Sequence, residues 1–173
     1  MRSKLGLSAL TLVAALVVTA LVAPAASAHG KGKGKHHTTL VRIEAEQLQS
    51  EFLDLGTRGP SLGDELVFSQ LLFIHNREVG TGGSVCTITE ATAPYDVLTY
   101  HCVGTLSLRK GQITVQGLIE VQGEDDPGPF TLAITGGTGA YTDAGGVVTF
   151  RNRGNLDGVY KLRFATQKQH HRH

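Results

Sequence analysis

Apolar and β-branched residues gather in short runs along this chain, and Gly, Pro, Asp and Asn separate the runs. After the N-terminal segment, no stretch repeats apolar residues at the i, i+3, i+4 and i+7 spacing of an amphipathic helix. A series of short strands separated by turn residues is typical of an antiparallel barrel or sandwich. We therefore predict an all-β fold of eight strands. They cover residues 38–48, 64–75, 82–90, 98–108, 112–121, 130–135, 146–152 and 158–166.

The second predicted strand alternates clearly, so that Leu66, Phe68, Leu72 and Ile74 share one face with Gln70. The connection before it, residues 49–63, is the longest within the predicted domain and contains the pair Gly59-Pro60. Because long loops often carry function, we expect this one to lie across a mouth of the fold.

The N-terminus has the three parts of a secretory signal. Basic residues come first, an apolar run over residues 5–22 follows, and Ala26-Ser27-Ala28 provides small residues for cleavage. An uncleaved membrane anchor is the alternative interpretation, because the apolar run approaches the length of a bilayer span. We expect residues 1–28 to be a signal peptide, the protein to be secreted into the extracellular space, and no membrane span to remain after cleavage.

Two tails flank the predicted β domain, which covers residues 38–166. Residues 29–37 alternate Gly with Lys and end in His, and residues 167–173 form a His-rich tail; we expect both to be flexible. Six of the eight histidines lie in these tails. They suit either a transition metal or an anionic surface, or they only keep the chain soluble. Residues 38–166 hold nine basic and 15 acidic residues, which does not indicate a nucleic-acid partner.

Cys86 and Cys102 are the only two cysteines. In an exported chain a pair favours a disulfide. Pro94 lies midway between them, so a hairpin that turns there would place the two residues opposite each other. The alternative is a free thiol that lines a cavity.

Four motifs resemble plant allene oxide cyclases and dirigent proteins, in the same order along the chain. They are Ser-Leu-Gly-Asp before an apolar strand with Phe68-Ser69, a Val-Gly segment that leads to Cys86, the run Gly-Gln-Ile-Thr-Val-Gln-Gly over residues 111–117, and Gly-Gly-Thr-Gly over residues 136–139. The resemblance covers residues 61–150. It implies an eight-stranded antiparallel β-barrel with an apolar cavity, a hydrophobic small-molecule ligand, no cofactor and a homotrimeric assembly.

The resemblance also suggests site residues. Gln70 corresponds to an asparagine that holds the epoxide-binding water in the plant cyclases, and Cys86 corresponds to a cavity cysteine. Glu44, or Glu46 on the same face, matches a first-strand glutamate of that family, although both glutamates equally suit a solvent-exposed rim. On this basis the catalytic candidates are Glu44 and Gln70. The ligand-binding candidates are Leu66, Phe68, Gln70 and Leu72.

Three functions remain open from the sequence. The chain either binds a hydrophobic molecule without converting it, or guides its cyclisation or coupling as a cofactor-independent isomerase, or acts as a structural protein of the cell surface. The sequence has no Gly-x-Ser-x-Gly elbow and no phosphate-binding Gly-Lys-Ser/Thr loop. The two histidines outside the tails, His75 and His101, do not have the spacing of metal ligands.

Overall fold

A computed structural model of the chain describes residues 38–92, 97–122, 127–154 and 156–166. The predicted signal peptide, the leader, the His-rich tail and the turn around Pro94 lie outside these residues. Within them no helix is long and apolar enough to cross a membrane. The strands are β1 (Thr38–Leu53), β2 (Glu65–Ile74), β3 (Arg77–Ala91), β4 (Val97–Leu108), β5 (Gly111–Gln122), β6 (Phe130–Gly137), β7 (Gly145–Gly154) and β8 (Asp157–Ala165).

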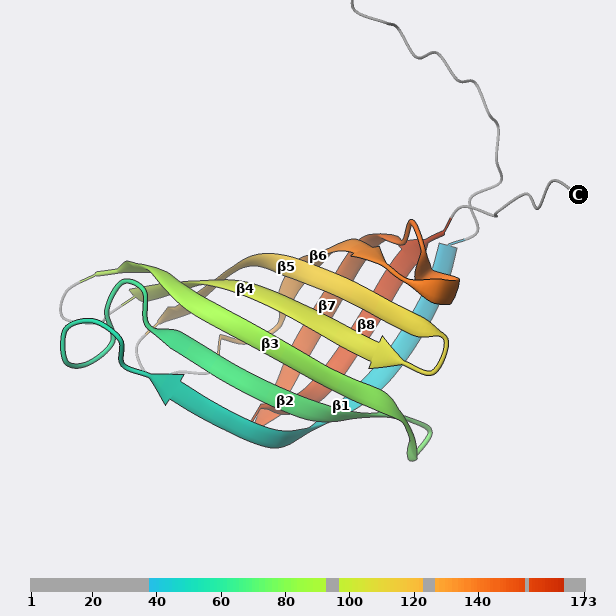
Figure 1. The fold of residues 1–173 in the computed structure, drawn as a ribbon, viewed down its shortest axis with the longest axis horizontal. Coiled ribbons are helices and arrows are strands. Elements are labelled where there is room, and N and C mark those ends of the chain that lie inside the picture. The colour runs from blue at the N-terminus through green and yellow to red at the C-terminus, as the bar shows by residue number, and fades with distance from the viewer. Residues whose placement is uncertain (1–37, 93–96, 123–126, 155, 167–173) are drawn as a thin grey trace, which may run out of the picture. The chain divides into compact units, whose positions relative to one another are not determined.

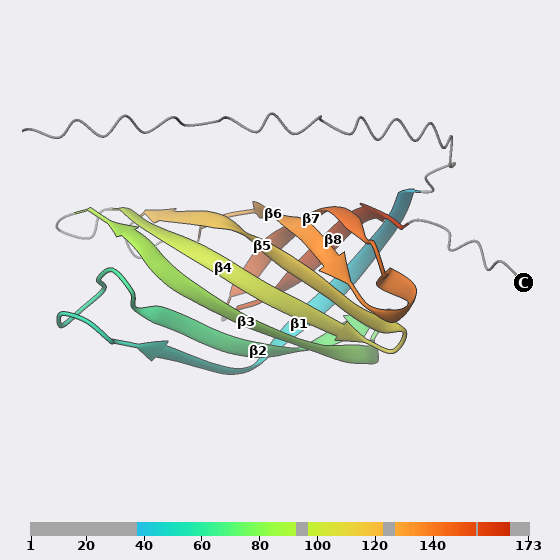
Figure 2. The ribbon, with the colours of Figure 1, turned by 45° about the horizontal axis from the view of Figure 1, so that its top comes forward.

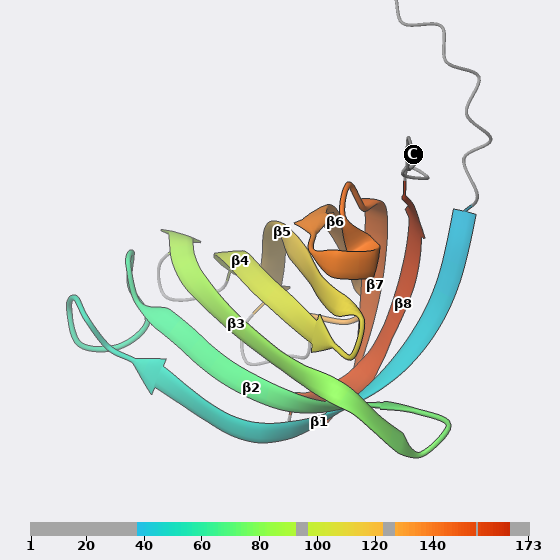
Figure 3. The same cartoon turned by 45° about the vertical axis from the view of Figure 1, so that its right-hand side comes forward.

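The eight strands form one closed antiparallel barrel (Figure 1), which confirms the predicted fold class. Each strand pairs with the next along the chain, and β8 returns to pair with β1 (Figure 3). Closure of this kind leaves no free sheet edge where the ladders are complete.

Two strand boundaries differ from the prediction by five residues, and the others by no more than two. β3 begins at Arg77 rather than at residue 82, because His75 and Asn76 make a two-residue turn with positive φ angles of 50° and 59°. Such turns match the twist of a hairpin, and Asn-Gly is their usual sequence signal. β1 also continues to Leu53, so five residues of the predicted 49–63 loop belong to a strand that pairs with β2.

The barrel is closed by hydrogen bonds over only part of its length. β1 pairs with β8 from Thr38 to Ala45, and β5 pairs with β6 from Ile113 to Gln116. Beyond these points β1 continues beside β2, and β5 continues beside β4. Figure 2 shows β1–β5 extending past the ends of β6–β8. We call the fully paired part the closed half and the extended part the open half.

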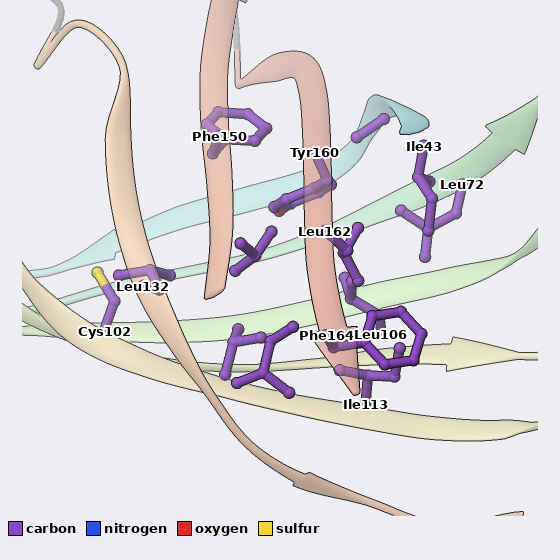
Figure 4. Packing of buried hydrophobic residues seen from close by; sticks show 14 of the residues in the cluster. Ile43, Leu72, Cys102, Leu106, Ile113, Leu132, Phe150, Tyr160, Leu162 and Phe164 are labelled. Carbon is purple, nitrogen blue, oxygen red and sulfur yellow. The ribbon is translucent and has the colours of Figure 1, made fainter. Parts of the chain in front are cut away.

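Side chains fill the closed half completely. Their packing (Figure 4) brings together residues from strands across the barrel: Ile43, Leu72, Leu106, Ile113, Ile134, Val148, Leu162 and Phe164. A short 3-10 helix, η1 (Gly139–Tyr141), lies at this end. Its Tyr141 ring packs edge-on against the Phe164 ring, with the ring centroids 6.0 Å apart. The predicted Gly-Gly-Thr-Gly turn leads into η1, and its last residue, Gly139, is the first residue of this helix. A Cβ at Gly139 would collide with the carbonyl of Lys110, so this glycine allows the close approach of two backbones.

Candidate functional site

The interior of the open half is a cavity of about 230 Å³. Its wall is mainly apolar, and five of its side chains are aromatic. The apolar and aromatic part of the lining includes Leu66, Phe68, Ile119, Val121, Phe130 and Phe150. Binding sites for small molecules are typically concave and apolar with a few oriented polar groups, and this cavity has that composition.

Three aromatic rings in successive contact form one side of the cavity. The ring centroids of Phe130 and Phe150 lie 5.4 Å apart, and those of Phe150 and Tyr160 lie 4.6 Å apart. Phe150 and Tyr160 are register partners on β7 and β8, so the barrel ladder itself fixes their contact. The planes of the two ring pairs are tilted by 39° and 47°, and rings at these separations attract each other and form an apolar wall.

A buried hydrogen-bond chain forms the polar part of the inner wall. The Tyr160 hydroxyl donates to Gln70 Oε1 at 2.7 Å, and Gln70 Nε2 donates to the Leu156 carbonyl at 2.5 Å. Gln70 is only 1% exposed. Burial raises the pKa of the Tyr160 phenol well above its usual range, so Tyr160 is neutral at physiological pH.

Leu156 owes its part in this chain to an unusual backbone conformation. It lies in the turn between β7 and β8 with a φ of 61°, a region that residues with branched side chains seldom adopt. The conformation costs about 1–2 kcal/mol for a residue with a Cβ. Near this turn, the backbone N–H of Gln47 donates to Asp157 Oδ1 at 2.6 Å. These two hydrogen bonds hold the β7–β8 turn against β1 and β2, near the point where the pairing of β1 with β8 ends.

Tyr100 is the polar residue nearer the outer end of the cavity. Its side chain is partly exposed, and its hydroxyl has no hydrogen-bond partner among the described residues. Burial raises the pKa of the Tyr100 phenol, and the negative charge of Asp64 raises it further. Tyr100 is therefore a neutral phenol that is free to donate to, or accept from, a molecule in the cavity.

Asp64 anchors the loop that follows β1. Its Oδ1 accepts from the N–H groups of Leu55 and Gly56 at 2.8 and 3.1 Å, and its Oδ2 accepts from the N–H and the hydroxyl of Ser61 at 2.7 and 3.0 Å. Desolvation of the carboxylate raises its pKa, but these four hydrogen bonds outweigh that effect and the pKa of Asp64 is lowered. The Ser-Leu-Gly-Asp motif is thus a loop anchor beside the cavity.

The predicted ligand-binding residues fall into two groups. Leu66, Phe68 and Gln70 line the cavity together with Cys86, because alternate residues of β2 and β3 face inward. Leu72 faces inward as well, but it is fully buried in the packed core of the closed half and does not border the cavity.

Glu44 and Glu46 do not reach the cavity. Ile43 and Ala45 are the inward residues of β1, so the glutamates between them lie on the outer face. Glu44 pairs there with Arg42 at 3.2 Å, and both side chains are substantially exposed. The structure thus agrees with the solvent-exposed alternative for these glutamates and brings Gln70, not Glu44, to the site.

Cys86 and Cys102 form a disulfide and are register partners on β3 and β4. Both are nearly inaccessible to solvent, and both border the cavity. The bridge is therefore a part of the cavity wall as well as a crosslink between two strands.

The sequence-based prediction did not include four aromatic residues of the cavity wall, which are Tyr100, Phe130, Phe150 and Tyr160. Each lies on a predicted strand, and the alternation of β7 and β8 would have placed Phe150 and Tyr160 on inward faces. Across the described residues, no group of three His, Cys, Asp or Glu side chains is placed to hold a metal ion.

Comparison with known proteins agrees with this architecture. The family model described as the allene oxide cyclase barrel like domain matches residues 39–165. No curated protein matches the sequence. A solved structure named pyocyanin demethylase is 29% identical, with a TM-score of 0.62, over 73% of this chain and 99% of that one.

Two more distant solved structures share the fold. An exo-specific intermolecular Diels-Alderase is 16% identical, with a TM-score of 0.56, over 77% of this chain and 100% of its own. A pterocarpan synthase dirigent protein is 13% identical, with a TM-score of 0.56, over 79% of this chain and 94% of its own.

Proposed function

The chain belongs to the allene oxide cyclase barrel-like domain family, and from this premise we propose that it binds a hydrophobic small molecule inside the open half of its barrel. The observation that carries the proposal is the cavity of about 230 Å³, with its aromatic wall and its buried Gln70–Tyr160 pair. A cavity of about 150 Å³ is sufficient for benzene. This cavity therefore suits a molecule of about two fused rings.

The names of similar structures support this class of ligand. One acts on pyocyanin, one is a Diels-Alderase and one is a pterocarpan synthase, so barrels of this fold hold organic molecules. Pyocyanin has three fused rings and would have to project from the open end of the cavity; it is used as a probe beside naphthalene because its demethylase is the most similar of these three in sequence.

A pair of variants on β5 tests the proposal. Val121 borders the cavity, whereas Leu118 faces outward and is 63% exposed. We expect Val121→Trp to fill part of the cavity and to abolish the binding of pyocyanin and naphthalene, and Leu118→Trp to bind them as the wild type does. Isothermal titration calorimetry measures both, and a negative heat-capacity change on binding would mark the burial of apolar surface. If neither probe binds the wild type, or if both variants bind equally well, the cavity is not a ligand site.

A second candidate is that the barrel guides a reaction of the bound molecule without a cofactor. The observation that favours it is the shape of the site: a sleeve of rings with hydroxyl groups near both ends restricts the conformations of a flexible ligand. Cyclisation, isomerisation and oxidative coupling all gain rate or stereoselectivity from such restriction. Incubation with oxidised fatty acids, and with phenols together with an added one-electron oxidant that generates the phenoxyl radicals, followed by chiral chromatography of the products, tests it. Racemic products formed at the uncatalysed rate would leave binding as the function.

We further propose that the protein acts outside the cell. The three-part N-terminal segment supports export, and a disulfide is typical of oxidising compartments. Mass spectrometry of the protein collected from the medium of its host tests this proposal. An N-terminus at His29 is expected, and a protein that stays in the cell with Met1 intact would contradict it.

A further inference from the structure

The direction of the two hydrogen bonds in the inner wall of the cavity follows from one carbonyl group. The Leu156 backbone oxygen can only accept a hydrogen bond. The Gln70 side-chain atom beside it must therefore be the amide nitrogen. This fixes the orientation of the whole amide and turns Gln70 Oε1 toward Tyr160.

The same logic fixes the proton of Tyr160. Gln70 Oε1 carries no hydrogen, so the hydrogen bond of 2.7 Å between it and the Tyr160 oxygen requires the phenol to donate. The only hydroxyl hydrogen of Tyr160 is thereby committed to Gln70. What the Tyr160 oxygen still offers to a molecule in the cavity is its lone pairs. Because the phenol is held neutral by burial, it acts there as an uncharged acceptor.

We infer that the ligand carries a hydrogen-bond donor, a hydroxyl or an N–H group, at the end that meets Tyr160, and that molecules with only acceptors at this end are disfavoured. This inference rests on the proposed function, because it describes a molecule in the same cavity. An ether or ketone oxygen placed against the Tyr160 oxygen would face a second acceptor and would lose its hydrogen bond to water without replacement. A hydroxyl at the same point replaces that bond.

The outer end of the cavity has no such restriction. The Tyr100 hydroxyl has no committed partner among the described residues and can rotate to donate or to accept. Asp64 contributes a negative charge near this end. No charged side chain lines the cavity itself, so nothing in the described wall would pair with a carboxylate on the ligand. Asn152 also lines the cavity, but its Oδ1 already accepts from the N–H groups of Arg153 and Gly154, which leaves its amide nitrogen, and that nitrogen can only donate. Selectivity for a donor therefore has to come from the Tyr160 oxygen at the inner end.

The experiment compares 1-naphthol with 1-methoxynaphthalene, using naphthalene as a reference for the rings alone. These probes have nearly the same shape, but only the naphthol donates. We expect the wild type to bind 1-naphthol about threefold to tenfold more tightly than 1-methoxynaphthalene, which is the usual net value of one neutral hydrogen bond. Calorimetry at pH 7 on the full-length protein measures the ratio of the two dissociation constants.

Two variants locate the preference. Gln70→Met keeps a similar side-chain volume but releases the Tyr160 hydrogen, so the naphthol preference is expected to vanish or to reverse. Tyr100→Phe removes the free hydroxyl at the outer end, and the ratio is expected to keep its wild-type value. A ratio near one in the wild type overturns the inference alone, as does a preference that disappears in Tyr100→Phe. If none of the three probes binds, the proposed function fails, and this inference fails with it.

Thermal unfolding of each variant shows whether it is folded. If Gln70→Met does not fold, the wild-type ratio and its value in Tyr100→Phe still decide the question.

Discussion

Removal of the Cys86–Cys102 disulfide should destabilise the barrel by about 3 kcal/mol. The bridge closes a loop with a sequence separation of 16, and the entropy that such a crosslink takes from the unfolded chain corresponds to about that value. The change is Cys86→Ala together with Cys102→Ala. Because both sulfurs border the cavity, their loss enlarges an existing space and creates no new enclosed void. The β3–β4 ladder continues on both sides of the pair, so the variant should still fold.

Guanidinium chloride unfolding, followed by circular dichroism, measures the loss as a lower midpoint with a somewhat steeper slope, because the unfolded chain without the crosslink is more expanded. For a domain of this size, the corresponding fall in Tm is about 12 °C. The single variant Cys86→Ala is the matched control: it also breaks the crosslink and should lose nearly the same stability. Wild-type protein treated with dithiothreitol should behave like the double variant. A double variant within about 1 kcal/mol of the oxidised wild type would refute the reasoning.

Four further outcomes follow from the structure. Leu72→Ala should cost about 2–5 kcal/mol of unfolding free energy, whereas Leu48→Ala on the exposed part of β1 should change it by less than about 0.5 kcal/mol, as measured by urea unfolding. Asp64→Asn should release the loop after β1 and speed tryptic cleavage after Arg58; an unchanged cleavage rate would contradict the anchoring role. In the wild type, the protection of the anchored amides against hydrogen exchange should fall only as the pH drops below about 3.9, because the pKa of Asp64 is lowered in the folded state and its protonation removes the anchor. The pKa of Tyr160 is raised by folding, so its contribution to stability is complete below about pH 10 and declines above it; Tyr160→Phe should show a shallower alkaline decline in Tm.

The number and order of the strands could be predicted because each strand carries its own signal. Period-two alternation marks β2, and the glycine and proline residues between runs mark the turns. The tight turn at His75 and Asn76 was not predicted, because its positive φ angles occur in residues other than the usual Asn-Gly pair. The continuation of β1 to Leu53 was not predicted for another reason. The pairing of β1 with β8 stops at Ala45, so β8 does not cover the last part of β1. All three residues from Gln49 to Glu51 are therefore exposed, and this part of the strand lacks the alternation of buried and exposed residues that a half-buried strand shows.

The site was predicted only where one strand was sufficient. Leu66, Phe68 and Gln70 lie on one face of β2, and alternation alone places them together. The contact of Gln70 with Tyr160 and with Leu156 depends on barrel closure across the chain, and no local pattern reports it.

Glu44 shows how a resemblance and a local pattern can differ. The resemblance suggested a catalytic role, but the apolar residues of β1 fall at Val41, Ile43 and Ala45. This alternation already assigns the glutamate to the opposite face, and the structure places it there. Where the two kinds of signal disagree about the face of a strand, the alternation is the one that follows directly from packing.

The division of the barrel into a closed and an open half separates folding from recognition. Most of the fully buried apolar side chains and the β1–β8 ladder that closes the barrel lie in the closed half. The lining of the cavity, the β7–β8 turn and the loop anchored by Asp64 lie in the open half. Substitutions of partly exposed lining residues such as Leu66 and Val121 can therefore accumulate at a lower cost in stability than substitutions in the closed half, whereas loss of the Cys86–Cys102 bridge remains costly. A family built on this plan can acquire new ligands by altering one end of the molecule, while the other end preserves the scaffold.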